Sequence, residues 1–532
     1  MARMPPGGDG PASSGAPPHG FTGLGSWIER RSRFRPDHVA LVSGDRTWSY
    51  GELAERIVRL ANALRSLGVR PGDRVGWIGP NHPAFLEALF ATAKLGGALS
   101  PVNHRLDPVR VAKQLEDVAP TVLIANGPVG ASQLPDSVRA VIAVGDGADG
   151  SVDLESVVAG ASDDPVEEMV GPDDVCMIPF TSGTTGPSKG IMLTHANVTW
   201  NAINMVTFAD LRHDDVTLAI APFFRTGGTG VNVLPTLFMG GTVVVPEAVV
   251  ADEIHRSVER HRATIGFANP DLLDRLTASP LWTTADLSSL RYIITGGAPV
   301  PDRLIRTFLD RGVTLLQGYG LSEAAPVVLL LDPATALHKV GAAGRPLLFV
   351  EVRIAYEDGA AAEPGETGEL LVRGPNVMAG YWNRPDATRA AVDDDGWLRT
   401  GDAARMDEEG DVWIVDRVRD GFEVGGRLLF PGDVERVLFE HPAVANAGVA
   451  GLEGPDGLVG AHAFVVRRAG ASATAAEILE FCAERLPADA VPRAVTFVDQ
   501  LPRNSVGKLM RNELGALRAE PPTADLEPNP TA

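Results

Sequence analysis

The chain has 532 residues, 44% of which are hydrophobic, and its 68 acidic and 47 basic side chains give a formal net charge of −21 at pH 7. The length exceeds that of one ordinary domain, and the acidic balance argues against a general nucleic-acid-binding protein, which would carry a basic face. No apolar run approaches the roughly 20 residues that span a bilayer, so no integral membrane contact is predicted. Cys176 and Cys482 are far apart and form neither a disulfide framework nor a zinc motif, which fits a reducing cytoplasmic location.

The first part of the chain alternates predicted strands and helices. Residues 1–20 are rich in Pro, Gly and Ser and predict a disordered leader. Ser49 and Glu52 form the capping-box pattern of a helix that Gly68 ends. The predicted elements are strands over 39–44 and 46–50, a helix over 49–68, a strand over 73–79, a helix over 82–97 and strands over 98–103 and 290–297. Such alternation predicts an α/β fold with a buried, largely parallel sheet.

The texture of the sequence changes near residue 350. Alternating apolar and polar residues between Gly and Asp turns predict a small antiparallel sheet or barrel over 350–417, and a short α+β segment follows. The predicted domains are a leader over 1–20, a large N-terminal domain over 21–418 with a small β subdomain over about 345–418, a small α+β C-terminal domain over 419–518 and a disordered tail over 519–532.

Residues 180–190, FTSGTTGPSKG, place glycines, hydroxyl side chains and Lys189 between two apolar runs. A triphosphate needs many short hydrogen-bond donors. Glycines let backbone N–H groups approach it, Thr and Ser hydroxyls add donors, and lysine adds charge. The Walker spacing G-x-x-x-x-G-K-[ST] is absent. A flexible Ser/Gly linker is the competing interpretation, and the predicted strands on both sides disfavour it.

The 180–190 loop resembles the phosphate-binding signature of the AMP-forming adenylating enzymes, a superfamily that includes acyl-CoA and aryl-CoA synthetases. Within it, the sequence texture is closest to bacterial fatty acyl-CoA synthetases. Further motifs follow in the order typical of that superfamily and extend the resemblance over residues from about 25 to 515. They are ITGGAPVP (294–301), LQGYGLSEAAP (316–326), GELLVRGPNVMAGYWNRPDAT (368–388), GWLRTGD (396–402), DRVRDGFEVGG (416–426) and LPRNSVGKLMR (501–511).

The resemblance implies a set of site residues. Those implied to bind ATP are Thr181, Ser182, Gly183, Thr184, Thr185, Gly186, Lys189, Gly296, Gly297, Ala298, Gly318, Tyr319, Gly320, Leu321, Ser322, Asp402, Arg417 and Lys508. The implied catalytic residues are Lys508, Thr184 and Glu323, of which Glu323 and Thr184 would hold Mg²⁺. The implied acid pocket consists of Phe224, Arg225, Gly227 and Gly320, and the CoA tunnel is edged by Gly425 and Gly426.

Three of these residues also have plainer interpretations when each is taken alone. Glu323 fits a carboxylate at a helix start, Asp402 fits a turn aspartate and Lys508 fits a surface lysine near a C-terminus. The ordered set of motifs favours the resemblance over these separate interpretations.

The implied reaction has two halves. A carboxylate attacks the α-phosphorus of Mg-ATP and forms an acyl-adenylate and pyrophosphate, while Lys508 neutralises charge. The C-terminal domain is mobile in this superfamily, and we expect it to rotate about Arg419 before a thiol, usually that of CoA, attacks the adenylate. The resemblance therefore implies an ATP-dependent, AMP-forming acid–thiol ligase that uses ATP, Mg²⁺ and CoA and takes a small-molecule acid. The sequence identifies neither the acid nor the oligomeric state.

The acceptor half departs from the superfamily pattern. Arg419 replaces a lysine at the hinge, Arg427 and Leu428 replace a Glu-Asn pair, and GLEGPDGLVGAHAF (451–464) lacks a W-G-E element. These changes are either drift or the sign of another acceptor, such as an amine, a carrier-protein thiol or nitrite in diazo or N–N bond formation. A non-catalytic nucleotide-binding relative is a third interpretation, which the retained signature residues disfavour.

Two further departures lie in the adenylation half. Ser188 stands where a proline is usual, and Pro187 comes one place earlier. Arg225 stands beside the acyl pocket where a histidine is usual. Because arginine is fixed positive and binds anions bidentately, we expect Arg225 to contact the substrate carboxylate, a second acidic group or a small inorganic anion. Pairing with a neighbouring acid or carbonyl is the alternative.

Overall fold

The computed structural model describes residues 23–519 except 131–132, 146–149, 167–168, 182–187, 299, 333–334, 336–337, 340, 426, 469 and 504–508. The leader predicted over 1–20 lies outside the described residues. So does the tail predicted over 519–532, of which only residue 519 is described. The chain divides into two compact units. The first reaches to Arg353 and includes Leu371–Arg399, and the second consists of Ile354–Leu370 and the chain from Thr400 onward. The boundary at residues 418–419 stays a prediction.

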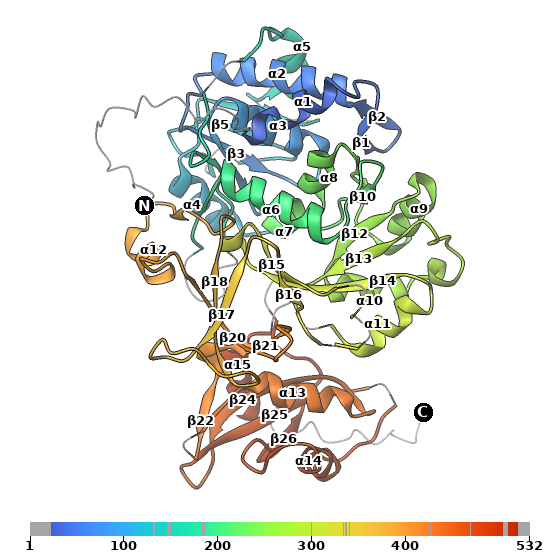
Figure 1. Cartoon of the computed structure of the whole chain (residues 1–532), viewed down its shortest axis with the longest axis vertical. Coiled ribbons are helices and arrows are strands. Elements are labelled where there is room, and N and C mark those ends of the chain that lie inside the picture. The colour runs from blue at the N-terminus through green and yellow to red at the C-terminus, as the bar shows by residue number, and fades with distance from the viewer. Residues whose placement is uncertain are drawn as a thin grey trace, which may run out of the picture. The chain divides into compact units, whose positions relative to one another are not determined.

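The first unit contains a nine-stranded sheet (Figure 1). Its strands in spatial order are β16 (Arg345–Pro346), β15 (Val327–Leu330), β14 (Thr314–Gly320), β13 (Tyr292–Thr295), β12 (Ile265–Ala268), β10 (Val216–Leu218), β11 (Thr242–Val244), β1 (Val39–Ser43) and β2 (Arg46–Ser49). The pairings β10–β12, β12–β13 and β13–β14 are parallel. The segments that follow β10 and β13 therefore emerge at the same edge as the carboxyl end of β14, which is where α/β sheets usually bind ligands.

An eight-stranded sheet forms the other large sheet of the first unit. Its strands in spatial order are β19 (Gly380–Tyr381), β9 (Ile191–Thr194), β8 (Val175–Met177), β4 (Ala98–Val102), β3 (Arg74–Ile78), β5 (Val122–Ala125), β6 (Ala140–Ala143) and β7 (Val152–Asp153). The strands from β8 to β7 in this order pair in parallel, whereas β8 and β9 form an antiparallel hairpin. The predicted α/β class with parallel-rich sheets is confirmed.

Helices cover these sheets, and α2 and α3 pack against each other (Figure 1). The helices of the first unit are α1 (Trp27–Ser32), α2 (Tyr50–Ser66), α3 (Pro83–Lys94), α4 (Pro108–Val118), α5 (Leu154–Gly160), α6 (His195–Phe208), α7 (Thr226–Gly230), α8 (Val233–Met239), α9 (Ala251–His261), α10 (Pro270–Thr277), α11 (Asp302–Leu309) and α12 (Pro385–Ala391). The predicted capping box of α2 is confirmed, because Ser49 Oγ accepts from Glu52 N and Ser49 N donates to Glu52 Oε2. Gly68 follows this helix with a φ of +96°, a conformation that favours glycine.

The second unit carries most of a four-stranded sheet and a compact α+β segment. The strands are β17 (Glu351–Ala355), β18 (Thr367–Arg373), β20 (Leu398–Met406) and β21 (Val412–Arg417), then the pair β22 (Phe422–Val424) and β23 (Arg427–Leu429), and the three-stranded sheet of β24 (Val444–Glu453), β25 (Val459–Arg467) and β26 (Ala494–Phe497). The helices are α13 (Pro431–Glu440), α14 (Ala475–Ala483) and α15 (Arg511–Leu514). Apolar side chains of α13, α14, β24 and β25 form one core cluster in this segment.

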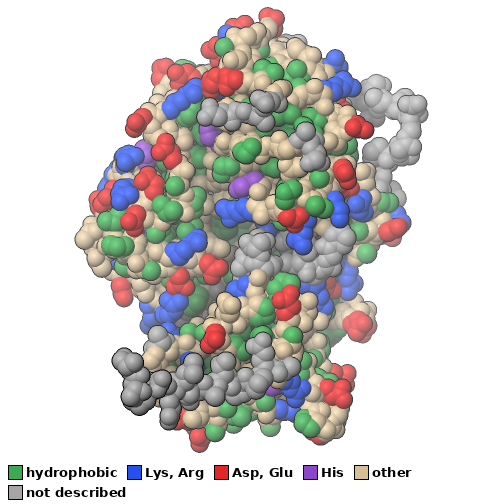
Figure 2. Space-filling view, turned by 180° about the vertical axis from the view of Figure 1, so that it is seen from behind, with side chains coloured by type: hydrophobic (Ala, Val, Ile, Leu, Met, Phe, Trp, Pro, Cys, Tyr) green, Lys and Arg blue, Asp and Glu red, His purple; other side chains and the backbone are tan. Residues whose placement is uncertain are grey.

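Acidic and basic side chains are interspersed over the described part of the face that Figure 2 presents. Among the helices of the described chain, none is both long and apolar enough to cross a membrane.

Candidate functional site

The loop over 180–190 joins the antiparallel strands β8 and β9, as the strand–loop–strand prediction required. Thr181 N donates to Lys189 O at 2.9 Å, and Lys189 N donates to Thr181 Oγ1 at 3.0 Å. Ser188 Oγ donates to Thr181 O at 2.6 Å and accepts from Gln114 Nε2 at 3.2 Å. Ser188 thus closes the neck of the loop with bonds that the usual proline could not make. The predicted phosphate-binding residues Ser182, Gly183, Thr184, Thr185 and Gly186 lie outside the described residues.

Tyr381 connects the predicted phosphate lysine to the predicted metal carboxylate. Lys189 Nζ lies 4.1 Å from the centre of the Tyr381 ring, which is a cation–π contact. Tyr381 Oη donates to Glu323 Oε1 at 2.8 Å. The pairing of β19 with β9 places this tyrosine beside the end of the 180–190 loop. Sequence reasoning missed Tyr381, although it lies inside the motif quoted over 368–388.

The predicted adenine-contacting segments lie side by side at the carboxyl ends of β13 and β14. A Cβ added to Gly296 would lie 2.5 Å from Gly318 O, so the two backbones approach as closely as glycine allows. Gly297, followed by Ala298, has a φ of +84°. Tyr319 is half-buried and pairs with Leu329 of β15. The structure therefore brings together two segments that the sequence separates by about 20 residues.

A second turn at this edge contains the predicted site residues at the end of β14 and directly after it. Gly320 is followed by Leu321, Ser322 and Glu323, and the last two begin a short 3₁₀ turn. Leu321 N donates to Pro326 O at 2.9 Å, and a Cβ on Gly320 would lie 2.0 Å from the same oxygen. Only glycine fits at position 320 without moving this backbone.

The segment after β10 connects both large sheets. Asn81 Nδ2 donates to Ala219 O and Ala221 O at 2.9 and 2.8 Å, and Asn81 Oδ1 accepts from Phe223 N at 2.8 Å. Asn81 follows β3 of the eight-stranded sheet, so it fixes the predicted acid-pocket segment to that sheet. Sequence reasoning missed it, because only the tertiary fold brings the two strand ends together.

The predicted acid-pocket residues lie next to the Ser322 turn. Thr226 Oγ1 donates to Ser322 Oγ at 2.8 Å. Phe224 is buried, Arg225 is half-buried, and a Cβ on Gly227 would lie 3.2 Å from the Phe267 ring. The predicted acid pocket therefore lies at the same edge of the first unit as the predicted nucleotide and metal residues that follow β14.

Asp402 and Arg417 form an ion pair in the second unit, with Arg417 Nε 2.9 Å from Asp402 Oδ1. The two residues face each other across the antiparallel pair β20–β21. Arg417 Nη1 also donates to Thr400 O at 3.2 Å, and Asp402 N donates to Thr400 Oγ1 at 3.0 Å. The ion pair with Arg417 holds the Asp402 carboxylate in place. The Asp402 side chain is 10% exposed, so the carboxylate remains partly accessible to solvent.

A partly buried cluster of charges lies at the predicted hinge. Arg511 Nη2 lies 3.0 Å from Asp416 Oδ2 and donates to Glu435 Oε2 at 3.0 Å, and Arg511 Nε lies 3.6 Å from Asp420 Oδ2. Burial raises the pKa of Asp416 to about 6, against the opposing charge of Arg511. Arg419, the predicted pivot, lies 3.5 Å from Asp420 Oδ1. Sequence reasoning missed Arg511, although it ends the quoted motif over 501–511.

The predicted CoA-tunnel and catalytic residues are only partly described. Gly425 occupies the turn between β22 and β23 with a φ of +60°. Gly426 and Lys508 lie outside the described residues.

A family model for the AMP-binding enzyme matches residues 28–382, and a model for the AMP-binding enzyme C-terminal domain matches residues 433–508. The chain belongs to the AMP-binding enzyme family. The match confirms the prediction that the chain is an enzyme of the adenylating superfamily. The prediction that it is an AMP-forming ligase that joins acids to CoA is also confirmed.

Relatives match this AMP-binding enzyme along most of its length. A feruloyl-CoA synthase from Amycolatopsis sp. is 43% identical over 497 residues, which cover 92% of this chain and 98% of the relative. An indoleacetate–CoA ligase from Aromatoleum aromaticum is 38% identical and covers 93% of this chain and 98% of its own length. The structure of an O-succinylbenzoate CoA synthetase from Bacillus subtilis in complex with ATP and magnesium ion is 31% identical, has a TM-score of 0.81, and covers 92% of this chain and 99% of that chain.

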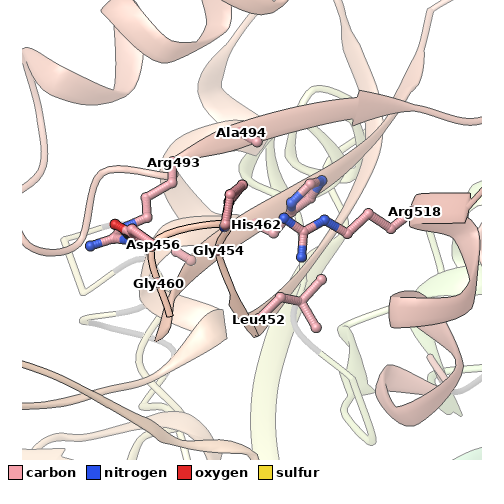
Figure 3. Close-up of a pocket in the computed structure, with 10 residues that line it drawn as sticks. Leu452, Gly454, Asp456, Gly460, His462, Arg493, Ala494 and Arg518 are labelled. Carbon is pink, nitrogen blue, oxygen red and sulfur yellow. Dashed lines mark hydrogen bonds and ion pairs between the residues drawn. The ribbon is translucent and has the colours of Figure 1, made fainter. Parts of the chain in front are cut away.

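The protein also has a cavity of about 330 Å³ in its second unit, lined by residues of the β24–β25 hairpin, by Arg493 and Ala494 at the start of β26, and by Arg518 (Figure 3). Arg493 and Arg518 lie on either side of His462 in this cavity. Arg493 Nη1 lies 3.0 Å from Asp456 Oδ2, and Arg518 Nη1 donates to Glu453 O at 2.6 Å. The lining therefore carries two guanidinium groups against one carboxylate. Seven of the ten lining residues lie within 451–464, the stretch that lacks the W-G-E element, and Arg493 and Arg518 come from later segments. The sequence did not identify these residues as a site.

Proposed function

We propose that the protein joins an aromatic acid to CoA through an acyl-adenylate, with ATP as the second substrate and Mg²⁺ as the cofactor. The observation that carries the proposal is the 43% identity to a feruloyl-CoA synthase along 92% of this chain. The match to an indoleacetate–CoA ligase supports the same class of acid. Fatty acids, which the texture of the sequence favoured, are the competing class.

The phosphates of ATP would lie at the 180–190 loop. Lys189 supplies positive charge there, and its contact with the Tyr381 ring orients the side chain. The hydrogen bonds between Thr181 and Lys189 hold the neck of the loop. The roles of Thr184, Thr185 and Lys508 remain those implied by the sequence motifs.

Glu323 would hold Mg²⁺. Within the described ranges, no group of three or more His, Cys, Asp or Glu side chains could by itself hold a metal ion. Mg²⁺ is usually held by one or two carboxylates together with substrate phosphates, so the single carboxylate of Glu323 fits it. The hydrogen bond from Tyr381 orients that carboxylate. When bound, Mg²⁺ would neutralise charge on the phosphates.

Asp402 would accept hydrogen bonds from the ribose hydroxyls, since a carboxylate has two oxygens that can accept from two neighbouring donors. Its ion pair with Arg417 orients it for this role. Tyr319 would stack on adenine against the Gly296–Ala298 turn. These roles all rest on the resemblance, and the geometry within each unit supports them.

CoA carries several phosphates at its nucleotide end. The cavity around Arg493, Arg518 and His462 offers more positive than negative side chains, so we propose that it receives one of those phosphates. This assignment gives the acceptor half a binding site in spite of the altered hinge segment.

The proposal is tested by measuring AMP and CoA-thioester formation with a panel of aromatic and fatty acids. We expect kcat/KM for an aromatic acid such as ferulate or indoleacetate to exceed that of saturated fatty acids by about two- to tenfold, the range that one well-fitted aromatic contact contributes. Lys189→Met should raise KM for ATP by about tenfold, whereas the matched control Lys113→Met, at an exposed position of α4, should not. A preference for fatty acids would reject the aromatic class.

A further inference from the structure

Two arginines from different sheets lie against one aromatic ring. The guanidinium carbons of Arg105 and Arg225 are each 5.8 Å from the centre of the Phe224 ring. Arg105 follows β4 of the eight-stranded sheet, and Arg225 follows β10 of the nine-stranded sheet. The ring of His104 meets the same phenyl ring edge-on at 5.6 Å. We call His104, Arg105, Phe224 and Arg225 the Phe224 cluster.

The Phe224 cluster has no acidic counterpart among the described residues, where neither arginine forms an ion pair with a carboxylate. Two other half-buried arginines of the first unit have such partners: Arg56 pairs with Glu87 at 2.7 Å, and Arg291 pairs with Asp215 at 2.7 Å. Burial lowers the pKa of Arg225, and the nearby positive charge of Arg105 lowers it further. A partly buried charge without a partner is unfavourable, so this position favours an anion from outside the protein.

His104 adds an unsatisfied polar atom to the cluster. Its Nδ1 is buried and has no hydrogen-bond partner in the described structure. Buried polar atoms are nearly always satisfied in a complete complex. Among the described residues, the arginines of the cluster therefore have no counter-ion, and His104 Nδ1 has no hydrogen-bond partner.

The cluster adjoins the site of the proposed reaction. Thr226, the residue after Arg225, donates to Ser322, and Ser322 precedes the proposed metal ligand Glu323. An acid bound for adenylation would lie along this edge. The reacting carboxylate loses its charge when it forms the adenylate, so an arginine fixed on it would stabilise the ground state more than the transition state. A second anionic group keeps its charge through both half-reactions and does not have this effect.

We propose that the aromatic acid carries a second carboxylate, which Arg225 binds as a charge-assisted pair while Arg105 adds positive charge from its exposed position. This inference rests on the proposed function and names aromatic dicarboxylic acids as the preferred members of its substrate class. Arg225 is then a specificity-determining residue that takes no part in the bond-making steps.

The test compares isosteric substrates on the full-length enzyme. The probes are cinnamic acids that carry a carboxylate at ring position 2, 3 or 4, each paired with the neutral carboxamide at the same position. For at least one position, we expect kcat/KM for the carboxylate to exceed that for the carboxamide by about 10- to 100-fold, the range of a hydrogen bond to a charged group. In Arg225→Gln this ratio should fall by about tenfold or more, and Arg225→Lys should restore part of it. Arg33→Gln, which removes a surface arginine with a 67% exposed side chain, should leave the ratio unchanged.

The outcomes separate the inference from the proposed function. A ratio near one for all positions, or an equal loss for both probes in Arg225→Gln, would overturn the second-carboxylate site while thioester formation upheld the ligase. Pyrophosphate release with nitrite alone that Arg225→Gln abolishes would also overturn it, in favour of an inorganic anion. Absence of AMP and thioester with every acid would reject the proposed function, and this inference with it.

Discussion

Replacing Tyr381 with Phe removes one hydroxyl and keeps the ring that faces Lys189. The lost interaction is the 2.8 Å hydrogen bond from Tyr381 Oη to Glu323 Oε1. Hydrogen bonds to charged groups contribute about 1.5–3 kcal/mol, which corresponds to about 10- to 100-fold in an equilibrium constant. Because the carboxylate of Glu323 would lose its orienting partner, Mg²⁺ binding should weaken by a factor in this range. We expect the Mg²⁺ concentration that gives half-maximal pyrophosphate release to rise about tenfold or more, with KM for the acid little changed.

The assay is a titration of Mg²⁺ at saturating ATP and acid, with release of pyrophosphate as the readout. Tyr356→Phe is the matched control, because it removes a tyrosine–carboxylate hydrogen bond to Glu366 at an exposed position of the second unit. The control should leave the Mg²⁺ dependence unchanged. A Tyr381→Phe enzyme with a lower kcat and an unaltered Mg²⁺ dependence would refute the claim that Tyr381 orients a metal ligand.

Four further outcomes are expected. Asn81→Leu, which breaks three hydrogen bonds to the acid-pocket segment, should raise KM for the acid by about tenfold and leave KM for ATP nearly unchanged in steady-state assays. Arg518→Gln should raise KM for CoA about tenfold without changing the rate of pyrophosphate release. Burial lowers the pKa of His195 from 6.5 to about 4, so the unfolded chain binds more protons than the folded chain between these pH values. The free energy of unfolding should therefore fall by up to about 3 kcal/mol as the pH decreases from 6.5 to 4. Thermal melts of His195→Asn should show a smaller loss over the same pH range. Asp416 should show the opposite pH dependence, because burial raises its pKa from 3.8 to about 6 and the folded chain then binds more protons between these values. The melting temperature of the unsubstituted enzyme, relative to that of Asp416→Asn, should decrease as the pH rises from about 4 to about 6.

Local signals in the sequence predicted the fold well. The capping box at Ser49 and Glu52 and the glycine at 68 identified α2, because these residues act on the same turns in which they lie. The alternation of strands and helices predicted the parallel sheets for a similar reason, since a strand buried on both faces must be apolar along its length.

The site could be predicted only where its residues belong to one motif. Glu323 and Tyr319 come from a single quoted stretch, whereas the partner of Glu323, Tyr381, reaches it through the pairing of Gly380 with Met192. Arg105 meets Arg225 only because the ends of two different sheets converge on Phe224. No spacing rule in the sequence encodes such a meeting, because register and packing between distant strands decide it.

The measurement that tests the central claim most directly is simultaneous quantification of AMP and CoA thioester from Mg-ATP, CoA and a panel of aromatic acids. The account predicts AMP and thioester in equal amounts with at least one acid, and no ADP. Formation of ADP, or AMP formation that needs the acid but yields no thioester when CoA is present, would contradict it.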